Sequence, residues 1–402
     1  MYIISTFLWL GSFFGPQEPA KEIVAQKVEP KVQVKVLIKG RVPACFLDVK
    51  GEFKVIDPKT GRHQIHSLSP KKGTLQIKDG IKWVDSFWGI HQIKVIPQQN
   101  DPLLVDGVEY FGNLEIIEAD NLLHIINEVA VEDYIKSYLV QHFSEKPLSK
   151  SVLEALSIVM RTDLYHTLMR NAQAFFHVDA KKAGYHGSSL RGLYPIIDRA
   201  VDVTKNKILL YKGRPFPATW TEHSAGKTAS YKSIFRQNFE GPGGSYAPLA
   251  LQNKEETYWT KEIPNEEITE QYGLASIKKI DLFIDNESEK IYAIRFFDQH
   301  RHVDVPISAL KDLFPSNNFR LETTPHSIKV RGWGKGLGVG LCLYNAARLE
   351  KEGASVEEIL KSSFPHTTIE TCPAVPELIA RFIEEEPPLW FAKKISALNE
   401  VP

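Results

Sequence analysis

Two short runs of this sequence place a carboxylate near a histidine, an arrangement that could move protons. Glu145 follows His142 by three residues, and Glu222 is followed directly by His223. One carboxyl group can act first as an acid and then as a base when partial burial raises its pKa toward neutrality. These runs therefore contain the candidates for acid–base chemistry, although an exposed acid near a helix end is the commoner fate of a residue such as Glu145.

Two other stretches suit binding better than proton transfer. Residues 218–228 form a loop rich in small and polar residues, and residues 331–340 are glycine-rich and contain Trp333 and Lys335. Glycines let the backbone approach a ligand or a neighbouring helix closely. Nucleotide binding is excluded, because Lys335 is followed by Gly336-Leu337 and the G-K-S/T ending of a phosphate loop is missing.

Helices in the segment Glu128–Thr162 must position the first group of residues. A short apolar run ends at the acidic pair at 132–133, which suits a helix N-terminus because carboxylates offset its partial positive charge. Apolar residues then recur at helical spacing, and a second, more thoroughly buried helix follows a break at Pro147. If the first helix persists to Glu145, that residue shares a helix face with His142.

The rest of the chain predicts an α+β fold. Short strands separated by turn residues indicate a mostly β N-terminal module at 32–109, on which the helices sit. A mixed α/β C-terminal part follows, with an inserted subdomain at 245–325. The other predicted elements are a loop at 175–189, helices at 196–204, 343–353 and 377–386, and a strand at 208–211.

The composition is that of a globular protein and excludes some partners. At 402 residues the chain can hold two or three domains. Lys+Arg and Asp+Glu both number 49, so the net charge is +0 and no attraction to nucleic acid is implied. The three cysteines and the histidines lack ligand spacing, so neither a metal site nor a cofactor is predicted.

Residues 1–31 predict an export signal and linker. The apolar run Tyr2–Phe14 is shorter than the about 20 residues that span a bilayer, and it is closer to the apolar part of a secretory signal. A buried strand is the alternative, which we weigh lower because Lys21–Lys31 has linker composition. We therefore expect an exported protein of the periplasm or cell envelope, with at most an N-terminal membrane signal.

Several motifs occur in one order over Tyr110–Thr367. They are Y-F-G-N-L-E from Tyr110, V-E-D-Y from Val131, R-T at Arg161, A-T-W-T-E-H-S-A-G-K-T from Ala218, and R-G-W-G-K-G-L-G-V-G from Arg331. In type and order they resemble the SpoIID/LytB family, whose active members are lytic transglycosylases of peptidoglycan. The domain implied by the resemblance covers 110–367 and leaves a C-terminal tail at 368–402.

The resemblance implies a glycan cleft and roles within it. The acidic residue of the family lies about two helical turns after the position of Tyr134. Direct counting reaches His142, whereas the E-x-P text matches Glu145. Thr221 and Lys335 stand where the family has histidine. The implied catalytic residues are Glu145 and His142, and Glu222 is the second-choice acid because it adjoins His223. The implied substrate-binding residues are Arg161, His223, Ser224, Gly226, Arg331, Trp333 and Lys335.

Two of these residues have structural alternatives of similar weight. Arg161 would support the acid or bind glycan, or it would satisfy the last carbonyls of its helix, since arginine is rarely buried unless it is paired. Trp333 would stack on a pyranose ring or pack in the core.

Three functions follow from these patterns. The first is a lytic transglycosylase that cleaves peptidoglycan glycan strands, preferably without stem peptides, between MurNAc and GlcNAc in cell-wall remodelling or division. The second is a protein that binds denuded glycan in the same cleft without cutting it. The third, weaker, is an envelope protein that docks an amidase or a division protein. An enzyme requires Glu145 or Glu222 at the floor of a groove, whereas a binder needs only aromatic and polar walls.

Overall fold

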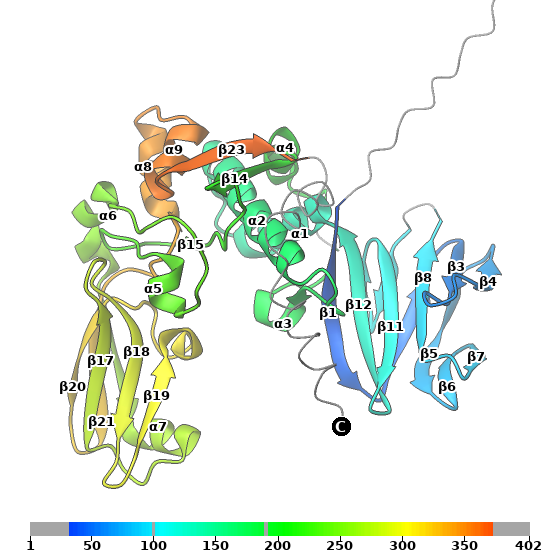
Figure 1. Cartoon of the computed structure of the whole chain (residues 1–402), viewed down its shortest axis with the longest axis horizontal. Helices are drawn as coiled ribbons and strands as arrows, with labels where there is room; N and C mark the ends of the chain where they lie inside the picture. The colour runs from blue at the N-terminus through cyan, green and yellow to red at the C-terminus, as the bar shows by residue number, and fades with distance from the viewer. Residues whose placement is uncertain (1–31, 99–100, 189–191, 373–402) are drawn as a thin grey trace, which may run out of the picture. The chain divides into compact units, whose positions relative to one another are not determined.

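The structure is a computed structural model that describes residues 32–98, 101–188 and 192–372 (Figure 1). Within these ranges it is mixed α+β with a strand-rich N-terminal region, as the sequence predicts. The expected export signal and the helix expected at 377–386 lie outside the described residues. None of the helices in these ranges combines the length and the apolar character needed to cross a membrane.

Two sheets form the N-terminal module (Figure 1). One has the order β13-β1-β12-β11-β8-β3-β4 and the other β10-β9-β2-β5-β6-β7. Burial alternates along the strands, as in β3 where Phe53 and Val55 point inward, and both sheets contribute to one hydrophobic core. The strands are β1 (Gln33–Val42), β2 (Ala44–Val49), β3 (Phe53–Ile56), β4 (His63–Ser67), β5 (Lys71–Ile77), β6 (Gly80–Trp83), β7 (Asp85–Trp88), β8 (Gln92–Pro97), β9 (Leu103–Val105), β10 (Val108–Tyr110), β11 (Asn113–Ala119), β12 (Leu122–Ala130) and β13 (Val178–Asp179).

The helices α1 (Val131–Phe143) and α2 (Lys150–Arg170) pack on this core (Figure 1). Helix α1 follows β12 directly and has two acidic residues in its first turn, as predicted. Its helical hydrogen bonding ends at Phe143, with Ser144 at the C-cap. The condition under which Glu145 would share a helix face with His142 is therefore not met, and Glu145 lies in the connection between the two helices.

Further elements complete this part of the chain. The predicted helix at 196–204 and strand at 208–211 are confirmed as α4 (Pro195–Val203) and β14 (Lys207–Tyr211), and the helix at 343–353 as α8 (Leu343–Lys351). The segment 175–189 is not wholly a loop, because β13 pairs parallel with β1 there and is followed by α3 (Ala180–Ala183). Strand β23 (Thr367–Thr371) pairs antiparallel with β14, and α9 (Val356–Ser363) precedes it.

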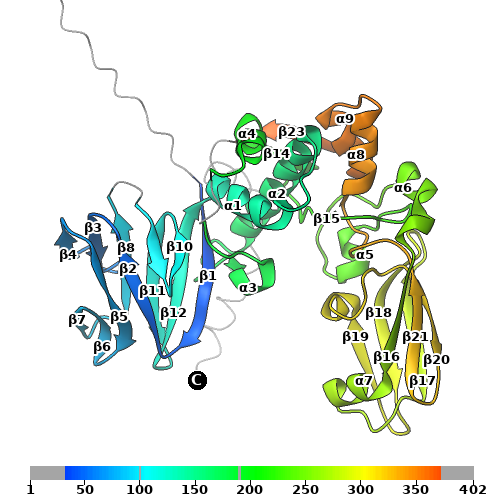
Figure 2. The same ribbon diagram turned by 180° about the vertical axis from the view of Figure 1, so that it is seen from behind.

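A second hydrophobic core occupies the downstream part of the chain. It draws on residues from 229 to 339, a wider span than the subdomain expected at 245–325. Two three-stranded sheets surround it, β16-β21-β20 and β17-β18-β19 (Figure 2). The elements are α5 (Tyr231–Phe235), α6 (Pro248–Gln252), η1 (Lys254–Thr257), β16 (Trp259–Pro264), α7 (Asn265–Tyr272), β17 (Lys279–Asp285), β18 (Lys290–Phe297), β19 (His302–Pro306), η2 (Ile307–Leu310), β20 (Phe319–Thr323) and β21 (Ser327–Gly332).

Candidate functional site

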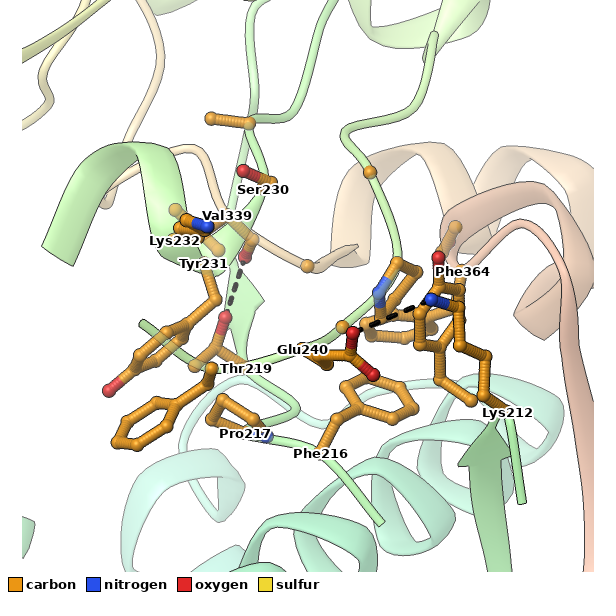
Figure 3. A pocket seen from close by; sticks show the side chains of 18 of the residues that line it. Lys212, Phe216, Pro217, Thr219, Ser230, Tyr231, Lys232, Glu240, Val339 and Phe364 are labelled. Carbon is orange, nitrogen blue, oxygen red and sulfur yellow. Dashed lines mark hydrogen bonds and ion pairs between the residues drawn. The ribbon is translucent and has the colours of Figure 1, made fainter. Parts of the chain in front are cut away.

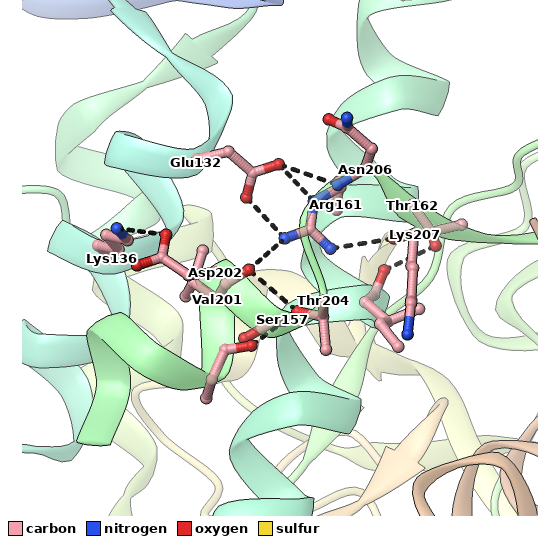
Figure 4. A network of polar contacts seen from close by, with 12 residues as sticks. Glu132, Lys136, Ser157, Arg161, Thr162, Val201, Asp202, Thr204, Asn206 and Lys207 are labelled. Carbon is pink, nitrogen blue, oxygen red and sulfur yellow. Dashed lines mark hydrogen bonds and ion pairs between the residues drawn. The ribbon is translucent and has the colours of Figure 1, made fainter. Parts of the chain in front are cut away.

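Arg161 is fully buried and ties three elements together (Figure 4). Its Nε and Nη2 donate to the Glu132 carboxylate at 2.8 and 2.6 Å, and its Nη1 donates to the carbonyl oxygen of Lys207 at 3.0 Å. The guanidinium thus joins α2 to the first turn of α1 and to the start of β14. A glycan cannot reach a side chain that is 0% exposed, so this placement opposes the substrate-binding role implied for Arg161.

The two loop motifs lie side by side. β15 (Trp220–Thr221) pairs parallel with β22 (Leu341–Cys342), and the backbones of His223 and Lys335 exchange hydrogen bonds at 3.0 and 2.9 Å. A Cβ on Gly340, whose φ is +78°, would stand 2.0 Å from the carbonyl oxygen of Thr219. Glycine at this position therefore allows the two motifs to approach each other closely. Packing between the motifs is enough to explain this glycine, without a bound ligand.

His223, Ser224 and Gly226 belong to this packed loop. His223 and Ser224 are 6% and 1% exposed, and the ring of His223 lies 4.6 Å from that of Tyr344. Lys290, itself buried, donates from Nζ to the carbonyl oxygen of Ser224 at 2.6 Å. Burial lowers the pKa of the Lys290 ammonium to about 8. These contacts hold the shape of the loop, and they leave the His223 and Ser224 side chains little access to a substrate.

The other nominated residues of these motifs are at least partly exposed, and each contacts a neighbouring side chain. The carboxylate of Glu222 lies 2.7 Å from Nζ of Lys335, and their side chains are 45% and 56% exposed. Arg331 pairs with Glu322 at the surface. Trp333 is half-buried, donates from Nε1 to Glu255 at 3.2 Å and has the Nζ of Lys254 4.6 Å from its ring centre. Glu222 therefore lacks the burial that a general acid of this kind needs.

Glu145 and His142 also lie at the surface. Glu145 is exposed in the connection between α1 and α2. His142 is exposed near the end of α1, where its ring stacks on that of Tyr138 with 3.9 Å between centroids. Its Nδ1 lies 2.9 Å from the carbonyl oxygen of Tyr138. Neither Glu145 nor His142 lines the groove that runs along α1 and α2.

A groove with a volume of about 790 Å³ lies along α1 and α2. Its walls come from the two helices, the β13–α3 segment, the loop before β15, α5, and Leu337 and Val339 of the glycine-rich stretch. Aromatic, aliphatic and polar side chains all contribute to these walls, and the side chain of Trp220 hydrogen-bonds to the phenol of Tyr138. The lining includes Tyr134, Tyr138, Asp163, Thr167, His177, Asp179, Lys182, Thr219, Trp220, Tyr231 and Val339.

Asp163 is a partly buried carboxyl in this groove that the sequence reasoning missed. Among the described residues, no hydrogen bond or ion pair reaches its carboxylate, and burial raises its pKa to about 7. Burial also raises the pKa of Tyr134, Tyr138 and Tyr231, and the charge of Asp163 adds to that effect in all three. The available signal was an aspartate within the buried apolar run of α2, directly after the R-T motif.

A second hollow of about 430 Å³ adjoins the groove (Figure 3). Thr219, Tyr231 and Val339 line both, and Thr219 donates from Oγ1 to the carbonyl oxygen of Val339 at 3.2 Å. Lys212 and Glu240 form an exposed ion pair on its other side. Together the two hollows offer a longer surface than either one alone.

No group of three histidine, cysteine or acidic side chains that could hold a metal occurs within residues 32–98, 101–188 and 192–372. The absence of a metal therefore stays a prediction.

Comparison with known proteins matches residues 119–211 to the family model SpoIID, described as "Stage II sporulation protein". An uncharacterised protein of Brachyspira hyodysenteriae is 23% identical over 325 residues, which are 78% of this chain and 86% of that protein. An uncharacterised protein of Chlamydia muridarum is 27% identical over 213 residues, 52% of this chain and 73% of its own. One of Chlamydia pneumoniae is 30% identical over 193 residues, 45% and 66% of the two chains. The matched family region contains α1, α2 and α4.

Proposed function

Because this chain belongs to the SpoIID family, we propose that it is a lytic transglycosylase that cleaves the glycan strands of peptidoglycan. The family is associated with the cell wall and sporulation. The proposed substrate is a strand without stem peptides, cut between MurNAc and GlcNAc, and the proposed location is the periplasm or cell envelope. A peptide-removing amidase reaction would supply such strands.

The groove along α1 and α2 is the observation that carries this proposal. Its aromatic and hydroxyl-bearing walls suit sugars, which present both apolar ring faces and hydroxyl groups. The adjoining hollow, which shares Thr219, Tyr231 and Val339, lengthens the surface in the way a linear polymer requires.

The proposed reaction needs one acidic group and no added water. The acid gives its proton to the bridging oxygen as the bond from that oxygen to C1 of MurNAc breaks, and the bonding electrons leave with the oxygen. The resulting carboxylate takes the proton of the 6-hydroxyl as that oxygen bonds to C1. The products are a 1,6-anhydro-MurNAc end and a GlcNAc end with a free 4-hydroxyl, and the acid is restored.

A second candidate function is binding of denuded glycan without cleavage. It is favoured by His142 at the position where counting places the acid of the family, and by Thr221 and Lys335 at two histidine positions. The exposure of Glu145 and Glu222 adds to this argument, because neither of the acids nominated from the sequence lines the groove.

Digestion of purified peptidoglycan separates the two functions. Amidase-treated and untreated material would be incubated with the protein, with heat-denatured protein as the control, and the products analysed by mass spectrometry. We expect anhydro-MurNAc ends from the amidase-treated strands. Sedimentation of the protein with the glycan, without new ends, would establish binding alone. If the protein neither produced new ends nor sedimented with the glycan, both functions would be refuted.

A further inference from the structure

We propose that Asp163 is the catalytic acid–base residue of this protein, in place of the carboxylate that the family carries at the end of the first helix. This inference rests on the proposed lytic transglycosylase function and names the residue that performs it. It is carried by the place of Asp163 on α2, by the surroundings of its carboxyl group and by the positions of the competing acids.

The position of Asp163 follows from the burial of Arg161. Successive residues of an α-helix are rotated by about 100°, so residues two apart point in nearly opposite directions. Arg161 faces the core, where Glu132 and Lys207 hold its guanidinium (Figure 4). Asp163 therefore faces away from that network, and it lines the groove. The same buried ion pair thus sets the rotation of α2 that presents the carboxyl group to a substrate.

The surroundings of Asp163 favour its protonated form. No cation or hydrogen-bond donor among the described residues stabilises its carboxylate, and the pKa of the group is raised to about 7 by burial. Tyr134 and Tyr138 from α1 and Tyr231 from α5 line the same groove. An acid that is half-protonated near neutral pH can both donate a proton to a leaving oxygen and take one back from an attacking hydroxyl.

The competing residues lack these properties. Glu145 is exposed in an interhelical connection, and Glu222 is exposed and paired with Lys335 at 2.7 Å. The ring of His142 stacks on that of Tyr138, and His142 is absent from the groove lining. Asp179 lines the groove, but its carboxylate accepts a hydrogen bond from the backbone N–H of Lys182 as the N-cap of α3.

In the proposed step, the protonated Oδ of Asp163 donates its proton to the bridging oxygen while the bond from C1 of MurNAc to that oxygen breaks. The departing GlcNAc keeps the electron pair and the proton as its 4-hydroxyl. The Asp163 carboxylate then accepts the proton of the 6-hydroxyl of MurNAc while O6 bonds to C1. The step consumes no water, oxidant or reductant, and it leaves Asp163 protonated for the next cleavage.

The variant Asp163→Asn tests the proposal, with Asp312→Asn as the matched control. Asparagine keeps the shape of the side chain but cannot transfer the proton, so release of anhydro-MurNAc ends should fall about 10²- to 10⁴-fold. Asp312 is exposed and outside the groove, and its variant should keep the wild-type rate. Asp163→Glu, which retains a carboxyl group, should recover part of the lost rate. Binding of denuded glycan by Asp163→Asn, measured by sedimentation, should stay within about twofold of wild type.

The pH dependence of the rate adds a readout that a structural role would not produce. The rate should fall as pH rises through about 7, because Asp163 must start protonated. The pKa of His177 is lowered to about 4 by burial, and the pKa values of the three groove tyrosines are raised, so none of these groups should titrate near neutrality. The titratable side chains that line the groove with Asp163 are Tyr134, Tyr138, His177, Asp179, Lys182 and Tyr231.

Three outcomes are distinguishable. Loss of product with Asp163→Asn, with glycan binding kept, supports the inference. Full activity of Asp163→Asn overturns the inference but leaves the lytic transglycosylase function standing. The same holds if Asp163→Asn stays active while the release of anhydro-MurNAc ends is lost in Glu145→Gln, Glu222→Gln or His142→Gln. No anhydro-MurNAc ends from the wild type refutes the proposed function itself, and the inference with it.

Discussion

The guanidinium of Arg161 engages both carboxylate oxygens of Glu132 inside the protein, with donor–acceptor distances of 2.8 and 2.6 Å (Figure 4). The two residues are 29 positions apart in the sequence. Their contact fixes the start of α1 against the middle of α2, and these two helices form one wall of the groove. This arginine of a family motif therefore stabilises the packing of the two helices and does not contact a substrate.

Removal of the Arg161 guanidinium should cost much of the stability of the protein. Arg161→Met leaves the largely buried Glu132 carboxylate unpaired, and we expect the free energy of unfolding to fall by about 3–5 kcal/mol. Urea unfolding would measure this fall in the free energy of unfolding. The exposed pair of Glu222 and Lys335 is the comparison, because Glu222→Gln should change the same quantity by less than about 1 kcal/mol. Equal effects of the two variants would contradict the assigned role of Arg161.

Asp163→Asn should make the protein more stable at neutral and higher pH. The carboxyl group of Asp163 has a pKa of about 7 in the folded protein, against an ordinary value of 3.8 for aspartate, so the folded state binds the proton more tightly. Ionisation of Asp163 therefore destabilises the folded state progressively between about pH 4 and pH 7. The asparagine variant should gain about 2–4 kcal/mol above pH 7 and nothing near pH 4. Thermal unfolding across this pH range would measure the gain in stability. A stability gain that does not vary with pH would contradict the burial of an ionisable carboxyl group.

His177 should produce a pH dependence of the opposite sign. Burial, and to a lesser extent the charge of Lys35, lowers the pKa of His177 from 6.5 to about 4. The unfolded chain then binds the proton more tightly, and stability is lost as pH falls from about 6.5 to about 4. His177→Asn, which keeps an acceptor for the backbone N–H of Lys35, should remove up to about 3 kcal/mol of this loss. His300→Asn, at an exposed site, is the control and should leave the slope unchanged.

Gly340 should tolerate no side chain. Its φ of +78° disfavours other residues, and a Cβ there would lie 2.0 Å from the carbonyl oxygen of Thr219, so the two motifs would have to separate. We expect Gly340→Ala to lower the free energy of unfolding by about 2 kcal/mol or more. Gly353→Ala shares the positive φ but meets no atom within 4 Å, so the difference between the two variants isolates the close contact. Denaturant unfolding that shows equal losses would argue against that contact.

Substitution of Trp220 should weaken glycan binding more than substitution of Trp333. Trp220 lines the groove beside Tyr138, whereas Trp333 is engaged by Glu255 and Lys254 outside it. We expect Trp220→Ala to weaken binding of denuded glycan about tenfold, or about 1.4 kcal/mol, through loss of an aromatic face. Trp333→Ala should have the smaller effect. The reverse order, measured by sedimentation or calorimetry, would place the glycan-binding surface around Trp333, outside the groove.

Local patterns in the sequence were sufficient for much of the fold. Short strand-like runs separated by turn residues predicted the N-terminal strands, and helical spacing with an acidic first turn predicted α1. The order of the motifs over Tyr110–Thr367 pointed to the family, and the match at 119–211 confirmed it. These features depend on neighbours within a few positions, so a single sequence contains them.

The candidate site could not be obtained in the same way, because it depends on contacts between distant segments. The sequence nominated Glu145 and Glu222 by their neighbours, and tertiary packing left both exposed. It nominated Arg161 as a ligand, and packing buried it against Glu132. Asp163 had no distinguishing neighbour except its motif, yet α1, α3 and α5 enclose it in a groove. A pKa is set by desolvation and by nearby charges, and those belong to the arrangement of residues in space and not to their order in the chain.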